Sequence, residues 1–323
     1  MRLLVLGGTV FLGRHVVAEA LARGDRVTVF TRGVHSVPDA VEHLVGDRAG
    51  DLSALERGEW DAVIDTSGYD AAHVARGAEL LADRVGHYVF VSSCNAYPSW
   101  PAEPIDEDSP VWGSDEDDYG PQKAASERAI AAAMPGRMAT VRSGLICGPH
   151  DNVFRLPWWV RRIAAGGRVP APGDPEQFVQ LVDARDLAAF MLGLAERRVP
   201  GAFNGTAPAR TTTMRDVLEA AVAATGSGAE LVWIADERLQ AAQVEPWTEL
   251  PLWIPAVEFP GTWQIGTERA QAAGLRCRPV AETVADVWAW LRAGGESELD
   301  EWRSEHRPPP MEPERERELL QAP

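Results

Sequence analysis

The first thirty residues carry the pattern that most restricts the fold. Residues 2–6 are an apolar run typical of a buried strand, and they lead directly into Gly7-Gly8-Thr9-Val10-Phe11-Leu12-Gly13. Residues 14–23 have helical periodicity that stops at Gly24, and residues 26–30 form a second apolar run. A strand, a glycine-rich loop, a helix and a strand in this order predict a parallel α/β unit whose loop brings backbone N–H groups close to a phosphate.

This unit is typical of dinucleotide-binding folds, in which the loop holds a pyrophosphate at the start of the helix. Val10 stands where the G-x-x-G-x-x-G motif has its middle glycine, so the match is incomplete. A tight strand-to-helix turn that binds no ligand is the alternative interpretation.

The end of the second strand bears on the choice of cofactor. Folds of this kind that prefer NAD carry an acid there for the ribose 2′-hydroxyl. This chain has Thr31 and then Arg32. A guanidinium in place of an acid suits a 2′-phosphate, so we expect NADP(H), with NAD(H) as the alternative and Arg14 as a further contact. A solvated loop arginine is the other interpretation of Arg32.

Strands and helices continue to alternate up to residue 150. This alternation predicts an α/β fold built on a Rossmann-like, doubly wound parallel sheet. Ligands of such sheets bind beyond the carboxyl ends of the strands. We therefore expect cofactor contacts from residues at or after further strand ends, namely Asp47, Arg48, Thr66, Gly68 and Ser92.

Lys123 is the only lysine among 31 basic residues. Lysine differs from arginine in its compact ammonium and its easily shifted pKa. Tyr119 lies four residues earlier, so on a helix the two side chains share a face, and the ammonium can lower the pKa of the phenol for acid–base chemistry. A chance pair on a helix surface is the alternative. The acidic stretch 101–118 just before them is expected to be a solvated loop, or else a rim that repels anionic substrates.

Composition narrows the classes of partner. The net charge of −17 disfavours nucleic acid and anionic membranes as partners. No apolar run approaches the roughly 20 residues of a membrane span, and the first residues do not read as a signal sequence. Three widely spaced cysteines provide neither a disulfide framework nor a metal-ligand spacing, so we expect no metal site and a cytoplasmic location.

The second half is less regular and predicts a smaller C-terminal domain. We expect residues 1–150 to form the dinucleotide-binding domain, with residues 178–205 returning to it. A substrate-binding domain would comprise residues 151–177 and 206–295. Residues 296–323 are charged and Pro-rich, which is typical of a surface tail.

Three motifs together resemble the extended short-chain dehydrogenase/reductases of the NAD-dependent epimerase/dehydratase type. They are the glycine loop, Ser92-Ser93 followed by Tyr97, and Tyr119-x-x-x-Lys123, and the resemblance covers residues 1–295. It implies that Tyr119 is the general acid–base, that Lys123 holds the nicotinamide ribose and lowers the pKa of Tyr119, and that Ser93 bonds the substrate oxygen. The cofactor would contact Gly7, Thr9, Phe11, Leu12, Gly13, Arg32, Asp47, Arg48, Thr66, Gly68, Ser92, Tyr119 and Lys123.

Departures from the family pattern narrow the chemistry. Cys94 and Asn95 stand where 4,6-dehydratases have Asp-Glu, which argues against that elimination. Aligning the family's R-D-[FYW]-[IV]-H-V-x-D stretch on Asp186 puts Val179 at the arginine that meets a diphosphate. A nucleotide-sugar substrate is therefore not expected.

The resemblance leaves three functions to separate. We expect an NADP(H)-dependent oxidoreductase that moves hydride to or from a small or medium carbonyl or alcohol. A cofactor-retaining epimerase is the alternative. The G-G-T-x-F-[IL]-G form of the loop also resembles chloroplast stem-loop RNA-binding proteins, although the Ser93, Tyr119 and Lys123 set and the charge argue against that function. The expected partner is a small molecule, no nucleic acid or membrane is expected, and a homodimer is left open.

Overall fold

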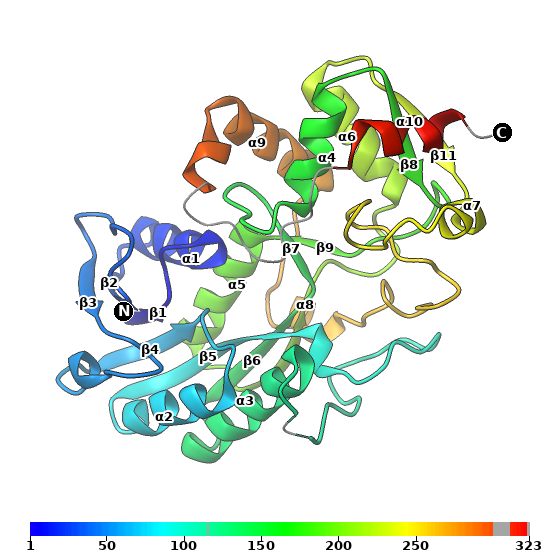
Figure 1. The fold of residues 1–323 in the computed structure, drawn as a ribbon. Coiled ribbons are helices and arrows are strands. Elements are labelled where there is room, and N and C mark those ends of the chain that lie inside the picture. The colour runs from blue at the N-terminus through cyan, green and yellow to red at the C-terminus, as the bar shows by residue number, and fades with distance from the viewer. Residues whose placement is uncertain (115, 300–310, 322–323) are drawn as a thin grey trace.

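The computed structural model describes residues 1–114, 116–299 and 311–321. A seven-stranded sheet in the order β3-β2-β1-β4-β5-β6-β10 forms the larger lobe, and its neighbouring strands are all parallel. The sheet confirms the predicted doubly wound α/β fold (Figure 1). Its strands are β1 (Arg2–Leu6), β2 (Arg26–Thr31), β3 (Glu42–Val45), β4 (Trp60–Asp65), β5 (Val85–Ser93), β6 (Met138–Ser143) and β10 (Gly201–Gly205).

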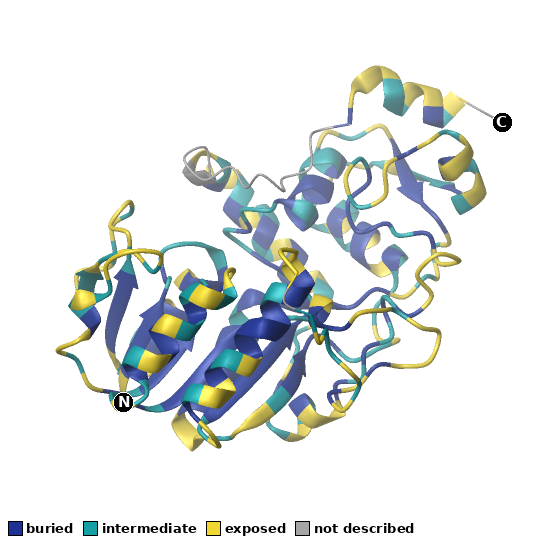
Figure 2. Cartoon of the chain, turned by 60° about the horizontal axis from the view of Figure 1, so that its bottom comes forward, coloured by how far each residue is buried: buried dark blue, intermediate teal, exposed yellow. Residues whose placement is uncertain are grey.

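Helices cover both faces of this sheet. Within β1, Leu3 and Val5 pack on one side and Leu4 and Leu6 on the other, as the two-residue period of a strand requires. The covering helices are α1 (Phe11–Ala22) beside α5 (Ala184–Arg197), and α2 (Ala71–Leu81) beside α3 (Tyr119–Ala133). Figure 2 shows the strands buried and the outer helix faces exposed. None of the helices in the described ranges has the length and apolar character to cross a membrane.

A second lobe lies over the carboxyl edge of the sheet (Figure 1). Its own core is rich in aliphatic and tryptophan side chains, including Trp159, Trp253 and Val287. Strands β7 and β9 pair in parallel, as do β8 and β11. The remaining elements are β7 (Leu145–Cys147), α4 (Arg155–Ala164), β8 (Arg168–Pro172), β9 (Leu181–Asp183), α6 (Met214–Thr225), β11 (Glu230–Ile234), α7 (Asp236–Ala241), α8 (Glu268–Ala272) and α9 (Val280–Arg292).

The C-terminal segment differs from its prediction as a surface tail. Helix α10 (Pro313–Gln321) packs against β8, and Met311 and Leu319 are buried in the core of the second lobe. The Arg162 guanidinium also pairs with Glu316. The prediction is wrong for residues 311–321, because the two apolar side chains Met311 and Leu319, set among many charged residues, are anchored in that core. Residues 300–310 of the predicted tail lie outside the described residues.

The acidic stretch before α3 is also more than a solvated loop. Ile105 is buried and forms a parallel bridge with Ile265. Glu107 is 8% exposed, and its carboxylate accepts a hydrogen bond from the backbone N–H of Asn204 at 2.8 Å. Part of this stretch is therefore a strap that joins the sheet to the second lobe. Asp115 lies outside the described residues.

Candidate active site

The glycine loop after β1 packs too closely for side chains at three of its positions. Gly7 and Gly8 both have φ of 101°, in the left-handed region that glycine favours. A Cβ on Gly7 would lie 2.4 Å from the Thr66 hydroxyl oxygen, and one on Gly13 would lie 2.6 Å from the Gly8 nitrogen. The glycines thus form a close-packed cradle of backbone in front of α1, which fits a dinucleotide pyrophosphate.

The first turn of α1 continues this cradle. The helix begins at Phe11 without a side-chain cap on its first N–H groups, so these donors are available to an anion. Phe11 itself has a positive φ of 29°. Of the other predicted loop contacts, Thr9 is half-buried, whereas Leu12 packs into the core of the sheet lobe. Leu12 therefore has only its backbone to offer a ligand.

The three predicted catalytic side chains lie together where β5 ends and α3 begins. Ser93 is the last residue of β5 and Tyr119 the first of α3, and their hydroxyls are hydrogen-bonded. Lys123 follows one turn later and is 3% exposed. Its Nζ donates to the carbonyl oxygens of Gly68 at 2.6 Å and Val91 at 3.0 Å. The lysine thus ties the loop after β4 to strand β5.

Burial dominates the electrostatics of this group. Burial lowers the pKa of Lys123 from 10.5 to about 8. Loss of solvation raises the pKa of Tyr119 to about 12, although the hydrogen bond with Ser93 and the charge of Arg155 act against this rise. Tyr119 is therefore protonated at neutral pH. Lys123 is not among the main groups that act on the Tyr119 phenol, since Nζ faces two carbonyls and lies 5.7 Å from the centre of the Tyr119 ring. The expectation that Lys123 lowers the pKa of Tyr119 stays a prediction.

Two predicted cofactor contacts point into the protein instead. Arg48 donates to both carboxylate oxygens of Asp65, at 2.7 and 2.5 Å. Ser92 donates to Glu127 at 2.5 Å, and Glu127 in turn pairs with Arg142 at 2.8 Å. Both side chains are occupied by these buried charges, so a cofactor contact from either residue would have to use its backbone. The predicted contacts of Arg48 and Ser92 stay predictions. The sequence places a residue at a strand end but does not show which way its side chain points.

Two further predicted contacts, Arg32 and Asp47, lie beyond β2 and β3. Arg32 is exposed and has no hydrogen bond or ion pair to other residues in the described parts of the chain. Thr31, just before it, hydrogen-bonds its hydroxyl to His43 at 2.7 Å. Asp47 is exposed, and its carboxylate accepts the N–H of Ala49 at 2.9 Å. Because strands β1, β2 and β3 are parallel neighbours, the residues that follow their carboxyl ends lie at the same edge of the sheet as the glycine loop.

Three further residues near Tyr119 were not predicted. The Lys123 ammonium lies 4.9 Å from the ring centre of Tyr69, which is 65% exposed beside the site. Arg155 reaches the site from α4 in the second lobe, and its guanidinium lies 4.6 Å from the ring of Trp247. The rule that strand ends face the ligand could have found Tyr69, which follows β4. Arg155 and Trp247 belong to no motif, so only the fold brings them to the site.

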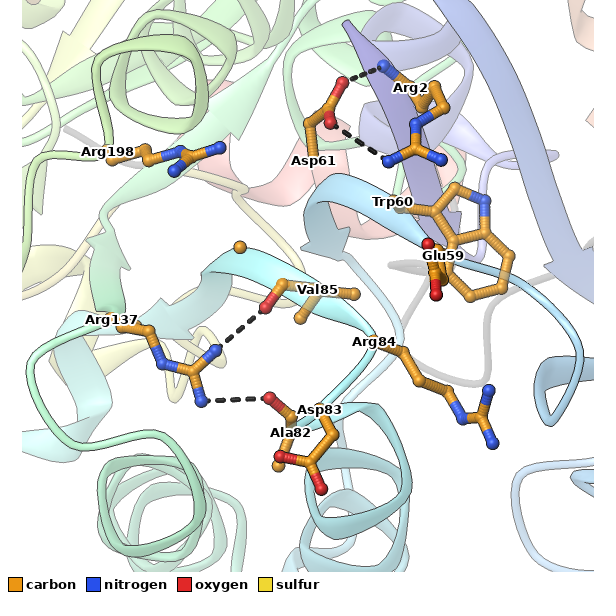
Figure 3. A pocket seen from close by; sticks show the side chains of 11 residues that line it. Arg2, Glu59, Trp60, Asp61, Ala82, Asp83, Arg84, Val85, Arg137 and Arg198 are labelled. Atoms are coloured by element: carbon orange, nitrogen blue, oxygen red, sulfur yellow. Dashed lines mark hydrogen bonds and ion pairs between the residues drawn. The ribbon is translucent and has the colours of Figure 1, made fainter.

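Other parts of the surface offer weaker sites. A hollow of about 530 Å³ lies at the opposite edge of the sheet, beside the starts of β4 and β5 (Figure 3). Two of its arginines are already engaged, since Arg2 bonds Asp61 and Arg137 donates to the carbonyls of Ala82 and Val85. Across residues 1–114, 116–299 and 311–321, no cluster of three or more His, Cys, Asp or Glu side chains could hold a metal.

Comparison with known sequences identifies similar proteins. Residues 71–204 match the family model described as the NAD dependent epimerase/dehydratase family. The Epimerase family protein SDR39U1 of Bos taurus is 30% identical over 250 residues, which are 70% of this chain and 81% of that protein. The 2-alkyl-3-oxoalkanoate reductase of Stenotrophomonas maltophilia is 30% identical over 232 residues, covering 62% and 67% respectively. The chloroplast stem-loop binding protein of 41 kDa b of Arabidopsis thaliana is 27% identical over 212 residues, covering 60% and 54%.

Solved structures share the fold across nearly the whole chain. The Bordetella bronchiseptica enzyme WbmH in complex with NAD⁺ has a TM-score of 0.69 and 18% identity, covering 91% of this chain and 99% of that one. The UDP-glucose 4-epimerase of Thermus thermophilus, in complex with NAD, has a TM-score of 0.65 and 21% identity, covering 90% and 99%. At these identities the likeness is one of architecture.

Proposed function

Because this chain belongs to the NAD-dependent epimerase/dehydratase family of extended short-chain dehydrogenase/reductases, we propose that it is an NADP(H)-dependent reductase of small or medium carbonyl compounds. The observation that carries this proposal is the hydrogen-bonded pair of Tyr119 and Ser93 hydroxyls beside the buried Lys123. A carbonyl oxygen placed against both hydroxyls meets two donors at once. The related 2-alkyl-3-oxoalkanoate reductase, by its name, reduces a carbonyl compound.

The protein's own groups would act on the substrate oxygen. Ser93 accepts the N–H of Asn95 at 3.1 Å, and its own proton would turn from Tyr119 to donate to that oxygen. Tyr119 would pass its Oη proton to the same oxygen as hydride arrives at the carbonyl carbon. When bound, a nicotinamide dinucleotide supplies that hydride. The tyrosine is 43% exposed, so its phenolate can regain a proton from solvent.

In the direction of reduction Tyr119 would act as the general acid. The protonated phenol is the form that this role needs. An alcohol oxidation or an epimerisation would start from the phenolate. The cradle at Gly7, Gly8 and Gly13 would hold the pyrophosphate, and Lys123 the nicotinamide ribose.

The direct test follows NADPH oxidation in the presence of a panel of aldehydes and ketones. We expect turnover by the wild type and a loss of about 10²–10⁴-fold in kcat for Tyr119→Phe, because only the proton donor is removed. Cofactor affinity of the variant should stay near that of the wild type, which calorimetry checks. Unchanged turnover by Tyr119→Phe would contradict the assigned role.

The proposed preference for NADP(H) rests on Arg32, which follows β2 where an acid would select NAD. Loss of a charged hydrogen bond to the 2′-phosphate costs about 1.5–3 kcal/mol. Calorimetric titration of Arg32→Ala should therefore show much weaker NADPH binding and unchanged NADH binding. Arg26→Ala, at the exposed opposite end of β2, is the matched control. Tighter binding of NADH than NADPH by the wild type would refute the preference.

A cofactor-retaining epimerase is the alternative that the names of several relatives support. Net consumption of free NADPH distinguishes the two, because an epimerase returns its hydride. We do not propose a nucleotide-sugar substrate, since Val179 is 2% exposed in the second-lobe core and carries no charge for a diphosphate. Micromolar binding of UDP-glucose in calorimetry would overturn this. An RNA-binding role, after the chloroplast relative, would need a gel shift at physiological salt.

A further inference from the structure

Arg155 is a cation in the active-site region that has no countercharge in contact with it among the described residues. Its Nε is buried without a hydrogen-bond partner in that part of the chain. No hydrogen bond or ion pair of its guanidinium occurs there either, in contrast to Arg48 and Arg142. Those two buried guanidinium groups pair with Asp65 and Glu127. Arg155 as a whole is half-buried, but buried guanidinium nitrogens normally have such partners, so the unmet Nε points to a ligand.

The local backbone adds to this unmet positive charge. Arg155 is the first residue of α4, at the positive end of the helix dipole, and the first turn of α4 contains no acid. The nearest carboxylate in sequence, Asp151, accepts the N–H groups of Val153 at 2.9 Å and Phe154 at 3.1 Å and forms no ion pair with Arg155 within the described residues. Burial also lowers the pKa of Arg155, although Asp151 acts against this. A bound anionic ligand would offset the free-energy cost of keeping the Arg155 charge unpaired.

Two tryptophans shape the surroundings of Arg155. Its guanidinium lies 4.6 Å from the ring centre of Trp247, which has a strained φ of 67°. The Trp247 ring lies 6.1 Å from that of Trp263, and the buried indole N–H of Trp263 has no hydrogen-bond partner within the described ranges. Strained backbone and unpartnered donors tend to occur together at ligand sites. We call the group of Arg155, Trp247 and Trp263 the corner. It combines a planar cation with apolar indole surface and the unpartnered Trp263 N–H donor.

The charge of Arg155 also acts on Tyr119, the proposed general acid. The positive charge of Arg155 stabilises the Tyr119 phenolate, and the two side chains come from opposite lobes. One small substrate can therefore contact both, with its reacting oxygen at Tyr119 and its anionic group at Arg155.

Building on the proposed reductase function, we propose that Arg155 binds the carboxylate of an oxo-acid substrate whose carbonyl meets Tyr119 and Ser93. The guanidinium fork matches a planar carboxylate, and the indoles of Trp247 and Trp263 would line its carbon chain. One guanidinium with Asp151 nearby suits a monoanion rather than a diphosphate.

The acidic stretch 101–118 does not exclude an anion. Asp108 pairs with Arg269 at 2.7 Å, and Glu107 is turned inward to the Asn204 N–H, so part of its charge is offset. Exposed charges farther away are screened by salt, whereas Arg155 would act on a bound carboxylate at contact distance.

Binding of a carboxylate that cannot be reduced tests this inference without requiring turnover. Calorimetry would compare octanoate with methyl octanoate, each titrated with and without saturating NADP⁺. We expect octanoate to bind at least about 10-fold more tightly than its ester, and Arg155→Met to weaken octanoate binding by about 10-fold to 100-fold without affecting the ester. Arg161→Met is the matched control on the same helix, since Arg161 is paired with Glu296. Equal binding of acid and ester, or octanoate binding unaffected by Arg155→Met, would overturn the inference.

Turnover separates this inference from the proposed function. With 3-oxooctanoate and its methyl ester as substrates, the wild type should prefer the acid in kcat/KM, and Arg155→Met should lose that preference mainly through KM. Arg155→Lys, which keeps the charge but not the fork, should recover part of the preference. If the ester is reduced as well as the acid, the inference fails and the reductase proposal stands. If octanoate binds through Arg155 but neither ketone consumes NADPH, the reductase proposal fails and the carboxylate site stands.

Discussion

The ammonium of Lys123 is enclosed by protein atoms, whereas most lysine side chains extend into solvent. Besides its two carbonyl acceptors, it lies 4.9 Å from the ring centre of Tyr69 and 5.1 Å from that of Phe90. Such a pocket selects for a small tetrahedral cation. The composition gave the first indication, because 31 basic positions include one lysine, and that lysine is buried.

This enclosure predicts that Lys123→Arg loses activity almost as fully as Lys123→Met. A planar guanidinium is too large to reach both carbonyls from the same position, even though its charge is kept. Steady-state kinetics with NADPH and a reducible ketone measure the loss. Arg128→Lys, a basic exchange on the exposed side of α3, is the control and should leave kcat/KM near the wild-type value. Wild-type turnover by Lys123→Arg would show that size and shape at this position do not matter.

The lowered pKa of Lys123 also predicts a pH dependence. The ammonium is charged below about pH 8 and neutral above it in the folded protein, because burial disfavours the charge. If the charge holds the cofactor, kcat/KM should be level below pH 8 and fall above it. Between about pH 8 and 10.5 the unfolded chain binds more protons at this residue than the folded chain, so its contribution to stability rises with pH. Residual activity of Lys123→Arg should lack the break near pH 8, and a break there in that variant would assign it to another group.

At the scale of elements, the buried pair of Arg48 and Asp65 joins the exit of β3 to the end of β4. Asp65 is fully buried, and it also accepts a hydrogen bond from the Tyr88 hydroxyl at 2.6 Å. Burial alone would raise the pKa of Asp65, but the charge and hydrogen bonds of Arg48 hold it below its usual value. The pair fixes the strand ends from which the ligand loops depart.

Breaking this pair should destabilise the sheet lobe. Asp65→Asn leaves a buried guanidinium uncompensated, which typically costs about 3–5 kcal/mol. Urea unfolding followed by circular dichroism measures the change. Glu19→Gln removes the exposed partner of Arg23 on α1, and we expect it to cost less than about 1 kcal/mol. Similar losses in both variants would mean that burial does not determine the strength of these pairs.

Individual elements also show which parts of the structure could be predicted from the sequence. Strand β1 was predicted with its observed limits, since a parallel strand buried on both faces is a continuous apolar run. The joint position of Ser93, Tyr119 and Lys123 was expected from the family resemblance and from the four-residue spacing of Tyr119 and Lys123. The inward turn of Ser92 and the docking of α10 were not expected, because both depend on partners distant in sequence, Glu127 and β8. Arg155 could not be predicted because its role depends on where the second lobe places α4.

At the scale of the whole molecule, the second lobe is completed by a helix that lies far along the chain. Leu319 of α10 is 3% exposed, and Arg238 donates to its carbonyl at 2.6 Å. We expect Leu319→Ala to cost about 2–5 kcal/mol through the cavity it leaves, and Glu318→Ala, on the exposed side, to stay within about 0.5 kcal/mol. Thermal unfolding of both variants checks this. Equal melting temperatures would mean that α10 contributes little to the lobe.

The burial of the only lysine has a practical consequence for labelling this protein. Amine-reactive acylating reagents have two possible targets, the Met1 amine, which is paired with Asp25 at 2.6 Å, and Lys123. Since Lys123 is 3% exposed, its acylation requires the loop after β4 to move away from β5. The fraction acylated at Lys123, read by peptide mass spectrometry, therefore reports how often the site opens transiently, separately from reaction at the Met1 amine. Binding of a dinucleotide should therefore be detectable as reduced acylation of Lys123.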